Sequence, residues 1–262
     1  MERNEFATAV VDSAPDNRHA SSSAPHRRAL PAALSSAPRH DLYRNIHGGL
    51  RLCMGEALTA VGRMDADDPA DVAAVTLQMN EMLALFRGHL EKEDTFVHPA
   101  LEARQPGSTS RIAHDHAKHV SAFTRLAADV QALREASTPR RRAAASALHR
   151  DLAAFVADNL VHMAAEEADH NAVLWSTHTD AELLALEQAI VASVAPPLRT
   201  AYMRWMVPAI PHADRAALLS ALRESAPAEA FDATLAMLMP HLGQRDWAKL
   251  MAALRSGATG RN

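Results

Sequence analysis

Apolar residues recur at every third or fourth position in four long segments of this chain, the spacing that gathers them on one face of an α-helix. The pattern predicts helices over residues 40–63, 70–103, 109–136 and 139–175. Connections that contain Asp, Ser, Gly and Pro separate these segments, and such residues commonly end helices. Four amphipathic helices joined in this way predict an all-α fold, an antiparallel up-down four-helix bundle.

The side chains that we expect to face the interior of this bundle are not all apolar. The predicted inward positions are Tyr43, His47, Leu50, Met54, Ala57 and Val61 in the first helix, Met79, Met82, Phe86, His89, Glu93, Phe96 and Ala100 in the second, Ile112, His116, His119, Phe123, Leu126, Val130 and Leu133 in the third, and Leu148, Leu152, Phe155, Asn159, His162, Glu166, Asp169 and Val173 in the fourth. Burying ionisable groups without partners is costly, so a metal or mutual contacts should satisfy them.

These ionisable positions are also expected to lie at the same end of the bundle. In an up-down arrangement, the start of the first and third helices lies at the same end as the close of the second and fourth. The candidates fall at that end in all four helices, which predicts one shared metal site. Its expected ligands are His47, His89, Glu93, His116, His162 and Glu166, with His119 as a further ligand.

This ligand set is too large for one tetrahedral zinc ion and suits two octahedral ions bridged by carboxylates. Glu93 and Glu166 are the expected bridges. Imidazole-rich coordination favours iron over manganese, so the expected cofactor is a pair of iron ions. The alternative is a group of buried histidines that hydrogen bonds satisfy without any metal.

Three other histidines are weaker candidates for the metal site. His98 follows Glu93 by five residues, so a regular helix turns it away from the site unless Pro99 distorts the helix, and we expect it to pack at the bundle end. His170 either supports the site from outside the ligand set or lies on the surface. His114 falls off the inward face and is expected to be solvated.

Four further residues adjoin the candidate ligands or the inward face. Asp94 or Asp115 could orient a ligand through its free ring nitrogen, although solvation is the simpler expectation for both. Tyr43 lies one turn before a candidate ligand and could cap the pocket or belong to the core. Cys53 is expected to be structural.

The segments on either side of the predicted bundle differ from it and from each other. Residues 1–39 are rich in Ser, Ala, Pro, Arg and His and have no apolar period, which predicts a disordered extension or a misassigned start. The bundle domain is assigned to residues 40–176, and 180–262 is predicted to be an additional C-terminal helical domain. Its expected helices lie at about 180–194, 198–207, 212–225, 227–242 and from 245 onward. This added length suggests an interaction or regulatory role.

Composition and charge indicate which kinds of partner and which cellular compartment to expect. Hydrophobic residues form 48% of the 262 positions and aromatic residues only 4%, which is typical of an all-helical protein. A net charge of -4 favours neither nucleic acid nor a membrane surface as partner. A single cysteine excludes an internal disulfide, and no apolar run suggests a signal peptide or a membrane span. The expected location is the cytoplasm.

Residues 40–175 resemble the hemerythrin-like HHE cation-binding proteins, four-helix bundles that hold a non-haem di-iron centre. That family has a His on the first helix, His-x-x-x-Glu on the second, one or two His on the third, and His followed by a carboxylate on the fourth. The matching positions are His47, His89, Glu93, His116, His162 and Glu166. Oxygen-carrying hemerythrins differ, because their third helix has two His four apart, whereas His116 and His119 are three apart here. Their fourth helix also ends its motif with an Asp at the fifth position.

The resemblance implies a cytoplasmic di-iron protein that binds or senses oxygen, nitric oxide or peroxide, or responds to iron supply or oxidative stress. No residue is assigned a catalytic role. One alternative is a di-iron enzyme with peroxidase, oxidase or nitric-oxide-related activity. Another is an interaction module with a structural metal, whose C-terminal domain contacts a protein partner.

Overall fold

The structure, a computed structural model, describes residues 39–259. The predicted disordered extension lies outside the described residues, apart from its last position. Arg39 donates hydrogen bonds to Asp180 and to the carbonyl oxygens of Trp175 and His178. Residues 39–259 contain helices and no β-strand, which confirms the all-α fold.

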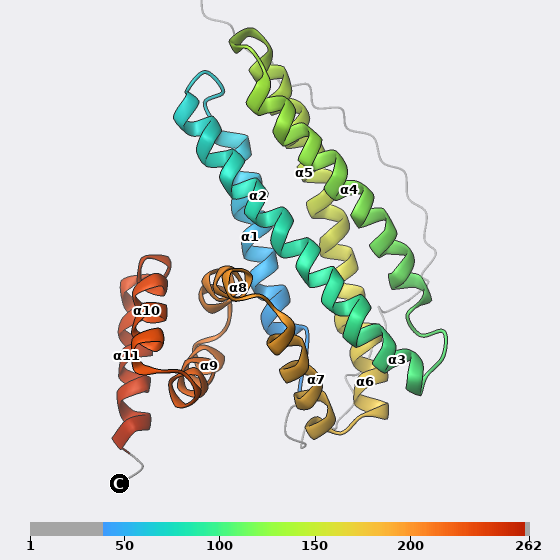
Figure 1. The fold of residues 1–262 in the computed structure, drawn as a ribbon, viewed down its shortest axis with the longest axis vertical. Coiled ribbons are helices and arrows are strands. Elements are labelled where there is room, and N and C mark those ends of the chain that lie inside the picture. Colours follow the sequence, from blue (N-terminus) through green and yellow to red (C-terminus); the bar gives the residue numbers. More distant parts are fainter. Residues whose placement is uncertain (1–38, 260–262) are drawn as a thin grey trace, which may run out of the picture. The chain divides into compact units, whose positions relative to one another are not determined.

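The predicted long helices are present, and two of them are interrupted (Figure 1). The elements are α1 (Arg44–Arg63), α2 (Pro69–Lys92), the π-helix η1 (Glu93–Val97), α3 (His98–Arg104), α4 (Ser110–Glu135), α5 (Thr138–Ala165), the π-helix η2 (Glu166–His170), α6 (Asn171–Thr177), α7 (Asp180–Ser193), α8 (Pro196–Ala209), α9 (His212–Ser225), α10 (Ala228–Leu238), the 3-10 helix η3 (Met239–His241) and α11 (Gln244–Thr259). The second and fourth predicted helices therefore each consist of two α-helices joined through a π-helical turn.

The four long helices pack around one apolar core. Helix α1 contacts α2 and α5, and α4 contacts the same two helices, so that each long helix has two neighbours. Phe86, Phe123 and Phe155 meet in the middle of this core, with ring centroids 5.3 and 5.7 Å from that of Phe155. Burial of apolar area against these neighbours is the main source of stability for such amphipathic helices.

The two π-helical turns shift the inward face by one residue. In η1, the backbone N–H of His98 bonds to the carbonyl oxygen of Glu93, five residues back, so one extra residue enters the turn. Pro99 accounts for a break at this place, because its ring clashes with a regular helical turn and it has no N–H to donate.

The predicted inward positions are consequently wrong beyond each π-helical turn. We expected Phe96, Ala100, Asp169 and Val173 to face the core, but the buried residues are Val97, Leu101, His170 and Leu174. Before each turn the predicted inward face is buried, with only His89 slightly exposed. The prediction failed because it applied the α-helical period through a turn that contains an additional residue.

Helix α8 lies against the bundle and links it to the last helices of the chain. It contacts α1 and α2, and a Cβ atom on Gly49 would lie 2.8 Å from the Cα atom of Met206. Tyr202 donates a hydrogen bond of 2.6 Å to the carbonyl oxygen of Leu85, and the Trp205 indole donates one of 2.6 Å to Glu81. Beyond α8, a second apolar cluster is formed by Val207, Leu219, Phe231, Leu238, Leu250 and Leu254.

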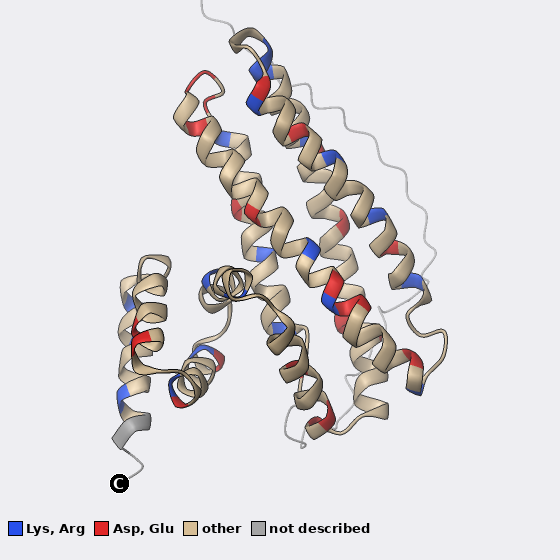
Figure 2. Ribbon diagram, in the orientation of Figure 1, with Lys and Arg blue, Asp and Glu red and all other residues tan. Residues whose placement is uncertain are grey.

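Charged side chains are scattered over the helices, with one acidic concentration in the connection between α1 and α2 and another where α2 passes into η1 (Figure 2). The second contains Glu91, Glu93 and Asp94, together with Lys92, which pairs with Glu91. None of the helices in residues 39–259 combines the length and the apolar composition that crossing a bilayer requires.

Candidate metal centre

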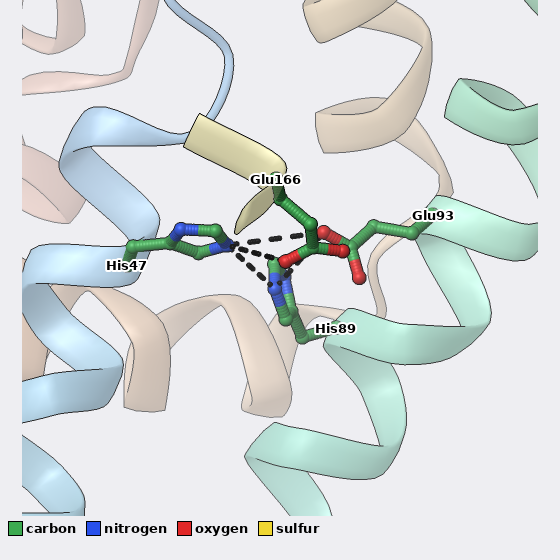
Figure 3. A group of neighbouring side chains, drawn as sticks. All are labelled: His47, His89, Glu93 and Glu166. Carbon is green, nitrogen blue, oxygen red and sulfur yellow. Dashed lines mark hydrogen bonds and ion pairs between the residues drawn. The ribbon is translucent and has the colours of Figure 1, made fainter. Parts of the chain in front are cut away.

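Six side chains from the four long helices converge at one end of the bundle. His47 comes from α1, His89 from α2, His116 from α4 and His162 from α5, while Glu93 and Glu166 are the first residues of η1 and η2. Figure 3 shows His47, His89 and the two carboxylates pointing toward one another. All six are buried except His89, whose side chain is 13% exposed.

Their ligand atoms form two groups that share both carboxylates. One group consists of His47 and His89 with the glutamates, the other of His116 and His162 with the same glutamates. Within each group the ligand atoms lie within 4.8 Å of one another, close enough to surround a single ion.

Each carboxylate directs one oxygen toward each group. Oε1 of Glu93 is 3.2 Å from Nε2 of His89, while its Oε2 is 3.5 Å from Nε2 of His116. Oε2 of Glu166 is 3.5 Å from Nε2 of His47, while its Oε1 is 3.2 Å from Nε2 of His162. Each carboxylate therefore faces both groups of potential ligand atoms.

Several buried polar atoms at this centre lack hydrogen-bond partners in the described part of the chain, which is consistent with bound cations. Both oxygens of Glu93, both oxygens of Glu166 and Nε2 of His116 are buried and have no hydrogen-bond partner among the described residues. Nε2 of His47 and Nε2 of His89 are 3.2 Å apart, and at most one of them can carry the shared proton. Buried polar atoms are normally satisfied, so converging lone pairs of this kind fit a metal.

Without a cation, the two carboxylates perturb one another. Burial and the charge of Glu166 raise the pKa of Glu93. Burial also acts to raise the pKa of Glu166, but the neighbouring imidazoles of His116 and His162 outweigh it and lower that pKa well below its usual value. Burial lowers the pKa of His89 far below its usual value, which favours the neutral imidazole that binds metals.

Two carboxylates outside the donor groups orient two of the histidines. Nδ1 of His47 lies 2.9 Å from Glu167, which also pairs with Arg51 at 2.6 Å. Nδ1 of His116 lies 2.7 Å from Asp94. In each case the bond fixes the ring with Nε2 directed into the centre.

The sequence left Asp94 open as an orienting residue and did not single out Glu167. Glu167 directly follows the candidate ligand Glu166, at the end of the bundle where α1 begins. This position was the sequence signal that could have identified it. Asp115, the other candidate for orienting a ligand, instead lies 2.8 Å from the Lys118 ammonium group.

The structure does not place His119 in either donor group. Its Nε2 is 2.9 Å from Asp158, and its ring centroid is 4.5 Å from that of His162. His119 therefore packs beside a member of the centre while its hydrogen bond points toward the surface. His114 is exposed, and Cys53 is buried, where burial raises the pKa of its thiol to about 12.

Two further histidines lie beside the centre: His98, which the spacing turned away from it, and His170, for which the sequence left a supporting role and a surface position open. The π-helical turn brings His98 inward, where its ring stacks on His116 at 4.8 Å with an interplanar angle of 18°. His170 is fully buried, and its Nδ1 lies 2.9 Å from the Tyr43 hydroxyl. Pro99 was the sequence signal for the distortion at η1, and no proline marks the corresponding turn at η2.

Comparison with known proteins agrees with this geometry. The family model of the hemerythrin HHE cation binding domain matches residues 40–171, half of the chain. All six converging residues fall within the matched range. Comparisons with curated proteins and with solved structures find no match. The chain belongs to the hemerythrin HHE cation-binding domain family, whose metal-binding helical domain it carries.

Proposed function

We propose that the HHE domain holds two iron ions and that the protein binds or senses oxygen, nitric oxide or peroxide. The observation that carries this proposal is the sharing of Glu93 and Glu166 between two donor groups, with one oxygen of each carboxylate turned toward each group. Two histidines at each position complete an imidazole-rich set, which suits iron better than manganese.

The chain's own residues would prepare both positions. Glu167 and Asp94 hold the Nδ1 protons of His47 and His116, so the Nε2 lone pairs face the centre. Bound iron would supply a change of oxidation state and coordination positions that the protein leaves open.

The space beside the centre is suited to a small ligand. A small cavity lies against His89, Glu93 and His162. The rest of its lining is Phe86, Leu90, His119, Phe123, Asn159 and Met163. Its volume of about 10 Å³ is near the minimum for one water molecule, which is far too small for an organic substrate.

Metal analysis of the aerobically purified protein, combined with its optical spectrum, tests the proposal. We expect two irons per chain and a charge-transfer band in the near ultraviolet. Replacing His89 or Glu93 by Ala should empty the centre, whereas the matched replacement of exposed His114 should leave it full. A single zinc per chain would contradict the proposal.

Azide or nitric oxide should change the spectrum of the loaded protein. Binding without turnover is the expected result for a sensing protein. Sustained consumption of peroxide or nitric oxide would instead assign an enzymatic function to the same centre.

A further inference from the structure

Two additional groups of ligand atoms adjoin the metal centre. Asp94, His98 and His116 form one group, and His98, Glu166 and His170 form the other, each with ligand atoms within 4.8 Å of one another. The two groups share His98. They also overlap the centre itself, the first through His116 and the second through Glu166. The result is a continuous series of side chains that could coordinate a cation, and it leads up to the two proposed cation positions.

Two histidines of this series, His98 and His170, are buried and only partly satisfied. His98 is 7% exposed and His170 is 0% exposed, and Nε2 of each has no hydrogen-bond partner among residues 39–259. Nδ1 of His98 is 3.1 Å from Asp94, and Nδ1 of His170 is hydrogen-bonded to Tyr43. Because both Nδ1 atoms have partners, Nε2 is the free ligand atom on each ring. Such an arrangement is costly unless the Nε2 atoms meet a cation or water.

The series begins at the protein surface. The Asp94 side chain is 47% exposed, and it lies in the acidic concentration where α2 passes into η1 (Figure 2). By contrast, Glu93 and Glu166 at the centre are only 4% and 0% exposed at their side chains. A hydrated cation is attracted by acidic surface groups and must exchange its waters for protein ligands before it reaches a buried position.

We propose that Asp94, His98 and His170 form an uptake path for a divalent transition-metal ion, with His98, Glu166 and His170 as a transit position. The proposal rests on the two-metal centre proposed above. Imidazole nitrogens with a carboxylate oxygen suit Fe²⁺ and the related ions Co²⁺ and Mn²⁺. The position is transient because Glu166 also serves both final positions, so a third cation there would face two others at short range.

Uptake of Co²⁺ by the metal-free full-length protein tests this path. Stopped-flow absorption of the bound ion gives the loading rate, and elemental analysis gives the final number of ions. Replacing His98 or His170 by Leu should slow loading by about tenfold or more. The final content should remain two ions per chain. Release to a chelator from the loaded protein should slow by the same factor, because uptake and release follow one path.

Matched replacements separate the path from general effects. His114→Leu removes an exposed histidine of α4 and should load at the parental rate. Asp94→Asn keeps an oxygen that can accept from His98 and His116 but removes the charge, and it should load several-fold more slowly than the parent. Glu91→Gln removes a charge three residues away on a side chain that is 68% exposed, and it should have a much smaller effect.

The outcomes distinguish this inference from the proposed function. Parental loading rates in His98→Leu and His170→Leu, with two ions bound, would overturn the uptake path and leave the centre intact. Failure of the parent to bind two ions would overturn the proposed function instead. Three stably bound ions in the parent and two in the variants would replace the transit position by a permanent third site. If the Leu variants do not fold, the loading rate of Asp94→Asn tests the uptake path. A rate equal to that of Glu91→Gln would contradict the path.

Discussion

The two ends of the helical bundle are built from the same four helices, but within residues 39–259 only one of them buries a group of ionisable side chains. Toward the connections after α1 and α4, the interior contains Met54, Val61, Val75, Leu133 and Leu148, all apolar and buried. Burial of such side chains contributes about 1.5–3 kcal/mol each. At the other end, imidazoles and carboxylates face one another with unsatisfied atoms. The apolar end therefore stabilises the fold, and the polar end is stabilised mainly when it binds a cation.

The largest expected effect is at the apolar end. Leu148 is 0% exposed, and Leu148→Ala should lower the free energy of unfolding by about 2–5 kcal/mol, because it removes buried methyl groups and leaves a cavity. The loss should be equal in metal-free and metal-loaded protein, as measured by urea unfolding. Val161→Ala, at a position 71% exposed on the same helix, should change stability by less than about 0.5 kcal/mol. A loss confined to the loaded protein would contradict the division between the ends.

Glu93→Leu should have the second largest effect, and only when metal is present. It removes a buried carboxylate that repels Glu166, so the metal-free protein should unfold at the same or a higher urea concentration than the parent. The stabilisation by metal, about 2.7 kcal/mol at a free concentration 100 times Kd, should disappear. Unfolding with and without a chelator measures both quantities. A clear loss of stability in the metal-free variant would show that the polar end also stabilises the fold.

Gly49→Ala tests how closely α8 covers the ligand-bearing helices. The new Cβ would lie 2.8 Å from Cα and 2.9 Å from N of Met206, and these backbone atoms cannot move aside without α8. We expect a loss of about 1–3 kcal/mol in unfolding free energy and a changed fluorescence of Trp205, which packs against the bundle core. Unchanged stability would show that the fit of α8 is loose.

The smallest expected effect is the matched replacement Gly55→Ala in the same helix. A Cβ at this position meets no atom within 4 Å. Alanine restricts the unfolded chain and favours the helix, so stability should rise by about 0.5–1 kcal/mol. Urea unfolding measures it, and a decrease would mean that α1 is constrained at its exposed face as well.

The sequence predicted the helices and the convergence of six candidate ligands because both depend on a period that four segments share. Past Glu93 and Glu166 the same period failed, since a π-helical turn has no distinct hydrophobic pattern. His119 had the right spacing, but its hydrogen bond to Asp158 is a tertiary contact that spacing does not contain. The packing of α8 on Gly49 was likewise absent from the prediction, because a glycine does not reveal which segment will cover it.

The two π-helical turns determine how this chain would respond to the deletion of single residues. Each is equivalent to a helix with one inserted residue, so deleting one residue would rotate everything after it by about 100°. Deleting only the residue in η1 would turn α3 and withdraw Val97 and Leu101 from the cluster that they form with Tyr43, Leu174 and Leu183. A deletion in η2 would do the same to Leu174. Both insertions therefore serve the same cluster, and we expect the loss of either one to require that this cluster be repacked.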